Sequence, residues 1–307
     1  MTESIHKYAK LGLIHFMAYP STIKGSGPIE ETIRKIAVDD YFDAIEITWI
    51  KDDDTRKRVK KMLDSSHLTV AYGAQPRLLT TGQNINDLDE EKRNLAVSNL
   101  KEGIDEAYEM GAVGFGFLSG KYTEDRKEEA YSALVKSTKE ICAYAESKGN
   151  LKIAHEVFDY DIDKCSLVGP VGLAKRYAQE ICKDFSNFGL LVDLSHLPII
   201  RESARQSLLP VKDYIIHAHM GNCVIKDKTD PAYGDAHPRF GYPGGENDVN
   251  ELVEYLKVLK EIGYLNPMNR RILSFEVKPV GDEDADIVVA NAKRVLNLAW
   301  SLLIDQI

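Results

Sequence analysis

The sequence has little cysteine and no long apolar segment. Its four cysteines stand far apart without a C-x-x-C pair, which favours free thiols in a reducing compartment over a disulfide framework. No apolar run approaches the roughly 18 residues that a membrane span requires. The N-terminus, MTESIHKYAK, also lacks the apolar core of a signal peptide. We therefore expect a soluble, cytoplasmic protein with no membrane partner.

The chain also lacks long blocks of like charge. Its formal net charge is -9, from 39 basic and 48 acidic residues. Nucleic acid is therefore a poor first choice of partner, because a polyphosphate backbone selects basic surfaces. Hydrophobic residues make up 44% of the chain, which is enough to form a large core. This composition argues against a disordered chain.

Short apolar runs of strand length alternate with longer amphipathic stretches, and the pattern recurs eight times. The predicted strands lie at residues 11–19, 43–50, 68–75, 112–120, 151–159, 188–196, 214–222 and 271–279. Eight such units predict an α/β protein with one (β/α)8 TIM barrel over residues 1–307 and an active site at the C-terminal ends of the strands. A Rossmann-type sheet is the alternative, but no G-x-G-x-x-G follows any strand.

Residues typical of helix starts and ends flank the amphipathic stretches. Asp87 followed by Glu90, and Asp248 followed by Glu251, predict two capping boxes, and Gly263 predicts the end of the second of these helices.

One connection is unusually long. About two dozen residues, from 221 to 247, separate the seventh strand from its helix, and connections of this length in compact domains are usually functional or disordered. This one carries Lys226, Asp235, His237 and Arg239 and leaves the C-terminal end of a strand. We therefore expect this connection to be a functional loop at the active site.

Side chains with metal-ligand chemistry stand at the ends of the last four strands, where a barrel brings them to one mouth. Buried carboxylates in apolar strands are costly unless a positive charge meets them. Separate structural ion pairs are the alternative, but a shared cation accounts better for four such residues on consecutive strands. The oxygen-rich set suits Mn²⁺, our first choice, or Mg²⁺ or Co²⁺. The predicted ligands are Glu156, Asp193, His219 and Glu276.

Other polar residues near these strand ends have less certain roles. His217 shares a face with His219 and would lie deeper, and His155 faces away from Glu156 as a core histidine. Residues that we expect to contact substrate are His196, Lys226, His237, Arg239, Lys278 and Trp49.

The strand-end pattern E…DxxH…HxH…E, with PGGEND after the seventh strand, resembles that of the xylose-isomerase-like barrel superfamily, which includes sugar isomerases, ketose epimerases and endonuclease IV. The resemblance covers nearly the whole chain. It implies one divalent ion bound by Glu156, Asp193, His219 and Glu276. It also implies that the two glutamates exchange protons with a sugar carbon, on opposite faces.

The sequence departs from the ketose epimerase pattern after the seventh strand. Epimerases continue with H-x-G-E and an arginine soon after, whereas this chain has Asn222 in place of the acid and no such arginine. An oxidised sugar, a glycoside or a phosphate therefore competes with a free ketohexose as substrate. Asp235-Ala-His237 is similar to a metal-binding D-x-H of endonuclease IV and leaves a second ion open. The histidines that endonuclease IV needs on strands three and four are absent.

These features lead to three functional hypotheses. The first is a metal-dependent sugar isomerase or epimerase, which removes a proton next to a carbonyl through a metal-stabilised enediolate. The second is a lyase that uses the same enolisation, of the type of the C-glycoside deglycosidase α subunit, which acts on 3-oxo-glycosides with a small partner subunit. The third is a carbohydrate-binding barrel that has lost turnover. A small-molecule sugar or glycoside is the expected partner, and assembly as a homo-oligomer or with a small partner subunit stays open.

Overall fold

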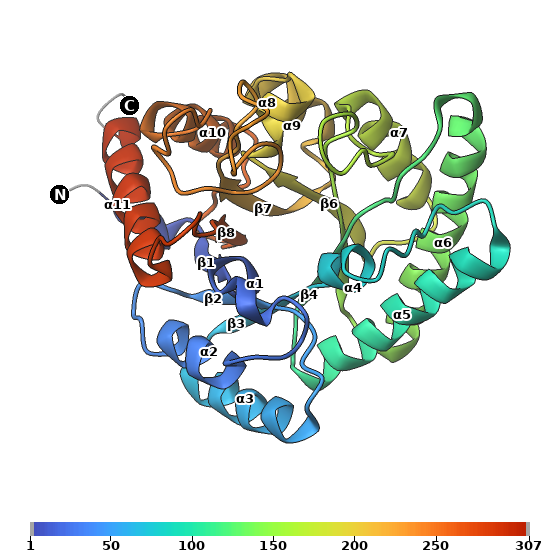
Figure 1. Cartoon of the computed structure of the whole chain (residues 1–307), viewed down its shortest axis with the longest axis horizontal. Helices are drawn as coiled ribbons and strands as arrows, with labels where there is room; N and C mark the ends of the chain where they lie inside the picture. The colour runs from blue at the N-terminus through green and yellow to red at the C-terminus, as the bar shows by residue number, and fades with distance from the viewer. Residues whose placement is uncertain (1–2, 305–307) are drawn as a thin grey trace.

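The chain folds into a closed barrel of eight parallel strands in the computed structural model, which describes residues 3–304 (Figure 1). Each strand pairs with the next in sequence, and pairing of the first with the eighth closes the barrel. Each strand overlaps one of the eight predicted segments, so the predicted (β/α)8 fold is confirmed. The strands are β1 (Lys10–Ile14), β2 (Ala44–Ile47), β3 (Thr69–Gly73), β4 (Gly114–Phe117), β5 (Lys152–Glu156), β6 (Phe188–Asp193), β7 (Ile215–Gly221) and β8 (Ile272–Glu276).

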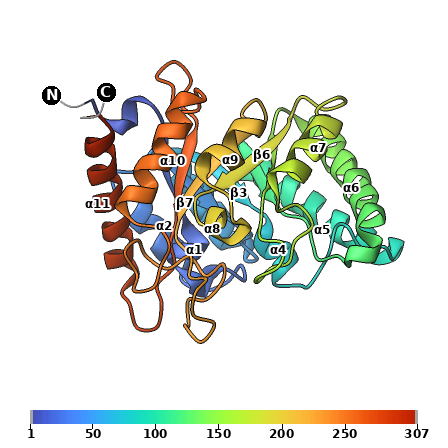
Figure 2. The ribbon, with the colours of Figure 1, turned by 90° about the horizontal axis from the view of Figure 1, so that it is seen from above.

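Helices form a ring outside the strands, and α11 lies beside both ends of the described chain (Figures 1 and 2). The α-helices are α1 (His15–Ala18), α2 (Ile29–Ala37), α3 (Asp53–Ser66), α4 (Gln75–Leu79), α5 (Glu90–Glu109), α6 (Lys127–Lys148), α7 (Val171–Ile181), α8 (His196–Ile200), α9 (Ala204–Leu208), α10 (Val249–Glu261) and α11 (Ala285–Ile304). The 3-10 helices are η1 (Ile5–Lys7), η2 (Pro20–Thr22), η3 (Glu124–Arg126) and η4 (Leu209–Val211). Within residues 3–304, no helix has the length and apolar character needed to cross a membrane.

One of the two predicted capping boxes is confirmed. Asp248 and Glu251 form a reciprocal cap at the start of α10. The prediction for α5 was wrong, because Asp89 caps this helix by accepting hydrogen bonds from the first-turn amides. Asp87 instead accepts from the amide of Asp89 in the preceding turn, at 2.9 Å. Both Asp87 and Asp89 are residue types that cap helices, and Asp89, which lies closer to the first turn, is the N-cap.

The long connection between β7 and α10 is fastened by one buried side chain. Asn222 is fully buried, and its carboxamide donates to the carbonyl of Arg239 and accepts from the amides of Cys223 and Asn247. This carboxamide therefore ties the start of the connection to its middle and its end. The loop brings Asp235 and His237 back over the C-terminal mouth of the barrel, where they line its cavity.

Candidate metal centre and cavity

The four predicted ligands converge at the C-terminal ends of β5, β6, β7 and β8. Glu156, Asp193, His219 and Glu276 each offer one ligand atom, and these four atoms all lie within 4.8 Å of one another. All four side chains are buried, with exposed fractions between 1% and 8%. The structure thus brings together the set that the sequence predicted, from four consecutive strands.

Neighbouring polar groups orient two of the three carboxylates of this quartet, those of Glu156 and Asp193. The amide of Gln75 donates to Oε2 of Glu156 at 2.8 Å. The backbone amide and hydroxyl of Ser195 donate to the two oxygens of Asp193 at 2.8 and 2.6 Å. Hydrogen bonds of this kind fix the rotamers of the side chains, and each carboxylate keeps lone pairs that could bind an ion.

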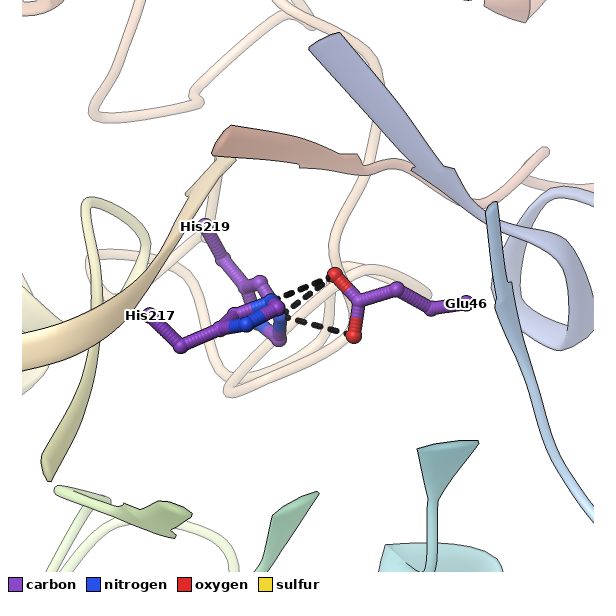
Figure 3. Close-up of side chains that lie close together, drawn as sticks. All are labelled: Glu46, His217 and His219. Atoms are coloured by element: carbon purple, nitrogen blue, oxygen red, sulfur yellow. Dashed lines mark hydrogen bonds and ion pairs between the residues drawn. The ribbon is translucent and has the colours of Figure 1, made fainter. Parts of the chain in front are cut away.

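His219 is oriented from the other side by Glu46 of β2, which reaches across the barrel (Figure 3). Oε1 of Glu46 lies 3.1 Å from Nε2 of His219 and 2.7 Å from Nε2 of His217. Burial raises the pKa of Glu46, but the two imidazoles outweigh it and hold this pKa well below its usual range. The carboxylate therefore stays charged and holds both rings by Nε2, which leaves Nδ1 of His219 on the side of the quartet.

Three ligand atoms of the quartet are buried without a hydrogen-bond partner in the part of the chain that the structure describes: Oε1 of Glu156, Nδ1 of His219 and Oε2 of Glu276. Nδ1 of His219 lies 2.8 Å from Oε2 of Glu276 and 3.7 Å from Oε1 of Glu156, but the groups are not aligned to hydrogen-bond one another. Buried polar atoms are rarely left unpaired, because each costs about 1–3 kcal/mol. A divalent cation among these atoms satisfies all three, so the residues present fit a metal ion.

Burial and neighbouring charges raise the pKa values of two members of the quartet, Glu276 and His219. Burial raises the pKa of Glu276 to about 7, although the imidazoles of His237 and His219 oppose this shift. Burial lowers the pKa of His219, but the carboxylates around it outweigh this effect and raise the pKa well above its usual value. Because metal ligands bind in their deprotonated forms, binding of an ion at these two groups would release protons.

A second cluster lies beside the quartet and contains a lysine. Oδ1 of Asp235 lies 3.0 Å from Nε2 of His196 and 2.9 Å from Nε2 of His237. Nζ of Lys164 lies 3.4 Å from both Oδ2 and the carbonyl of Asp235, and 2.5 Å from Asp163. Burial raises the pKa of Asp235, but His237, Lys164 and His196 outweigh it and lower the pKa well below its usual value. The charge that a second ion would supply is already supplied by this ammonium group.

His237 has an unusual backbone conformation, with φ of 53°. Left-handed backbone at a residue other than glycine is uncommon and concentrates at functional sites. Burial lowers the pKa of His237, but the carboxylates of Asp235 and Glu276 raise it to about 9. The ring lies next to Gly221, where a Cβ would approach Nδ1 of His237 to 3.0 Å and the carbonyl of Glu276 to 2.8 Å. A glycine is required there for the loop to cover the quartet.

A cavity of about 310 Å³ opens over the quartet and has two contrasting sides. Its polar side includes Glu156, His219, His237, Glu276 and Lys278. Another part of its lining, which we name the apolar wall, comes from the segments after β1 and β3. The apolar wall consists of Phe16, Met17, Pro20, Ile23, Pro76 and Leu79.

Four of the six residues predicted to contact substrate lie outside the lining of this cavity, and three of these have partners elsewhere. Trp49 donates its indole N–H to the carbonyl of Ile23, and its ring lies under the ammonium of Lys51. Lys226 is exposed and pairs with Glu246 at 3.0 Å. Arg239 pairs with Glu283 at 2.8 Å. These two acidic partners, both partly buried, hold the loop cations away from the cavity.

The other predicted contacts lie at or behind the cavity wall. His237 and Lys278 line it. His196 lies behind Asp235, and its Nδ1 is 2.8 Å from the carbonyl of Val157. His155 is fully buried between Phe117 and Tyr177, with both ring nitrogens unpaired in the described structure. It is a core residue as predicted, but an unsatisfied one.

Sequence reasoning did not find the roles of Glu46, Gln75 and Lys164. Glu46 and Gln75 were visible as polar residues near early strand ends, but their contacts depend on which strands face each other across the barrel. Glu46 carried one usable signal, since a lone acid within the apolar strand AIEI needs a buried partner. Lys164 lies in an irregular loop after β5 and gave no such signal.

A family model described as a xylose isomerase-like TIM barrel matches residues 35–293. The chain belongs to this family. The resemblance predicted from the strand-end pattern is thereby confirmed. Among curated proteins, none matches the sequence.

Solved structures with the same barrel include a D-tagatose 3-epimerase-like protein, with a TM-score of 0.71 and 21% identity over 97% of this chain and 99% of that one. The 3-keto-D-glucoside 4-epimerase from E. coli has a TM-score of 0.66 and 15% sequence identity, over 94% of this chain and 99% of that one. An IOLI protein with a bound zinc atom has a TM-score of 0.71 and 17% sequence identity, over 96% of this chain and 99% of that one. At these identities, the likeness shows that this xylose isomerase-like barrel shares their fold.

Proposed function

We propose that the protein is a divalent-metal-dependent sugar isomerase or epimerase, in which Glu156, Asp193, His219 and Glu276 hold one ion. The observation that carries this proposal is the convergence of three buried ligand atoms that lack hydrogen-bond partners. Mn²⁺ is the first choice because the donor set is oxygen-rich with one imidazole nitrogen. The epimerase names of proteins with this fold support the reaction class.

The two glutamates are the proposed acid and base. When bound, the ion would polarise a sugar carbonyl and stabilise the negative charge that develops on its oxygen. One of Glu156 and Glu276 removes the proton from the carbon next to that carbonyl, and the other returns a proton to the sugar. His237 and Lys278 line the cavity and donate hydrogen bonds to sugar oxygens. The apolar wall keeps water away from the carbon that loses its proton.

Solvent exchange tests this proposal directly. The purified protein, loaded with Mn²⁺, is incubated in D₂O with a panel of ketoses, aldoses and 3-oxo sugars, and deuterium on carbon is measured by NMR. We expect uptake with at least one sugar, and a loss of about 10²- to 10⁴-fold in Glu156→Gln and Glu276→Gln, the contribution typical of a general acid or base.

Glu91→Gln is the matched control, because this glutamate is exposed on α5 and the substitution removes the same charge. Absence of carbon-bound deuterium with every sugar would contradict the proposal. Sugar binding that both glutamine variants leave unchanged, without any exchange, would instead favour the non-catalytic binding barrel.

A lyase acting on 3-oxo-glycosides is the second candidate, and the apolar wall favours it. The six apolar side chains of this wall line the same cavity as the quartet, and such a lining suits an apolar aglycone attached to the sugar. Asn222 also holds the loop where ketose epimerases place a sugar-binding acid. Release of a free aglycone from a 3-oxo-C-glycoside, or copurification with a small partner subunit, would select this reaction over epimerisation.

Lys226, Arg239, Trp49 and His196 stay proposals for substrate contacts. The two loop cations would have to leave their acidic partners to reach the cavity. We also propose a cytoplasmic location, which the four free cysteines support.

A further inference from the structure

A second cavity lies at the opposite end of the barrel from the quartet. It has a volume of about 260 Å³ and is lined by residues at or near the starts of β1, β3, β4, β5, β7 and β8. We name it the basal cavity. The residues that matter here are Lys10, Thr69, Lys152, His217, Arg270 and Arg271.

The basal cavity is strongly cationic, although the whole protein is acidic. Four of its lining residues are lysines or arginines, and its lining contains no aspartate or glutamate as far as the structure describes the chain. Arg270 pairs with Asp43 at 2.8 Å. Lys10, Lys152 and Arg271 form no ion pair with any described residue, in a chain whose net charge is -9.

The three unpaired cations use few of their donors. Lys10 donates to the hydroxyl of Thr69 at 2.9 Å, Lys152 to the carbonyl of Ser186 at 3.2 Å, and Arg271 to a β7 carbonyl at 2.5 Å. A lysine carries three N–H donors and an arginine five, so most of the donors around the cavity have no protein acceptor. Like charges gathered without counter-charge repel one another, and an anion bound among them relieves that repulsion.

From these contacts, we propose that the basal cavity binds a small oxyanion of the phosphate or phosphate monoester class. Guanidinium and ammonium groups together supply the several charge-assisted hydrogen bonds that a phosphate accepts. The volume lies just below the usual range of ligand pockets and suits a phosphate with a small organic group better than a nucleotide. This site is separate from the proposed sugar site and does not depend on its chemistry.

The basal cavity also adjoins the contacts that orient the proposed metal ligand. His217 forms part of its wall, and Nε2 of this ring meets Glu46, which also meets His219 (Figure 3). The rings of His217 and His219 are 5.1 Å apart and perpendicular. An anion in the basal cavity would therefore lie two side chains away from His219.

Phosphate titration of the full chain tests the proposal. The protein is first dialysed against a chelator so that phosphate cannot bind a metal ion, and inorganic phosphate or glycerol phosphate is then added at constant ionic strength, with binding followed by calorimetry. We expect saturable binding that Lys10→Met and Lys152→Met each weaken by roughly tenfold or more, the value of a charge-assisted hydrogen bond. Lys10→Arg, which keeps the charge, should retain most of the affinity.

Lys61→Met is the control, since Lys61 is an exposed lysine of α3 outside this cavity. Tighter binding of glycerol phosphate than of inorganic phosphate would assign the site to monoesters, and the reverse to the free ion. The proposal is overturned if phosphate does not saturate the wild-type protein, if both methionine variants bind as the wild type does, or if chloride at equal ionic strength competes equally well.

Discussion

Replacing Glu46 with glutamine should weaken metal binding although Glu46 is not itself a proposed ligand. Its carboxylate is 4% exposed, and its Oε1 contacts Nε2 of both His217 and His219. A glutamine keeps the volume but loses the charge, and its carboxamide can accept a hydrogen bond through only one of its two ends. Both imidazoles then meet a neutral acceptor, so the charge-assisted contact that holds Nδ1 of His219 toward the quartet is weakened.

The expected weakening of Mn²⁺ binding follows from the charge-assisted hydrogen bond between Glu46 and His219. A hydrogen bond to a charged group contributes about 1.5–3 kcal/mol, and about 1.4 kcal/mol corresponds to a factor of ten in an equilibrium constant. We therefore expect Glu46→Gln to bind Mn²⁺ about 10- to 100-fold more weakly than the wild type. This range agrees with the usual effect of residues that orient a metal-bound histidine.

Calorimetric titration of chelator-treated protein with Mn²⁺ measures this difference. Glu91→Gln, with the same change at an exposed site, should bind as the wild type does. Circular dichroism confirms that each variant is folded. A folded Glu46→Gln protein with wild-type Mn²⁺ affinity would refute the reasoning, because it would mean that the contact with His219 does not orient a ligand.

Three further predictions concern the ion, pH and the second cluster. Mn²⁺ at a hundred times its dissociation constant should raise the free energy of unfolding by about 2.7 kcal/mol over chelator-treated protein, and urea denaturation that shows no gain would contradict the site. Burial lowers the pKa of His155 to about 3, so the unfolded chain binds this proton more readily and stability falls as the pH drops below about 6.5. His155 should thus account for about 2 kcal/mol of lost stability between pH 7 and pH 5. His155→Phe, in an aromatic setting of Phe117 and Tyr177, should remove that part of the loss in urea titrations at the two pH values, and an equal loss in both proteins would count against it. Lys164→Met should admit a second equivalent of Mn²⁺ beside Asp235, measured by metal analysis, whereas a single equivalent in both proteins would show that the lysine does not occupy a latent cation site.

The fold and the membership of the quartet could be predicted because both depend on local patterns. Apolar strands of a parallel barrel are continuous runs, and the C-terminal ends of those strands must meet at one mouth. Glu156, Asp193 and Glu276 each end such a run, so their proximity follows from topology without knowledge of any loop.

The remaining parts of the site depend on contacts that no local pattern encodes. Glu46 meets His217 and His219 only because β2 and β7 face each other across the barrel. Lys164 reaches Asp235 through an irregular loop that is held by backbone amides donating to the buried carboxylate of Asp159. Lys226 and Arg239, which were chosen for their chemistry alone, instead pair with the partly buried acids Glu246 and Glu283.

Anomalous diffraction from crystals grown with Mn²⁺ tests the central claim most directly. The account predicts one strong manganese peak at the C-terminal mouth, within bonding distance of carboxylate oxygens of Glu156, Asp193 and Glu276 and of Nδ1 of His219. A quartet without such a peak, or a peak bound by other residues, would contradict it.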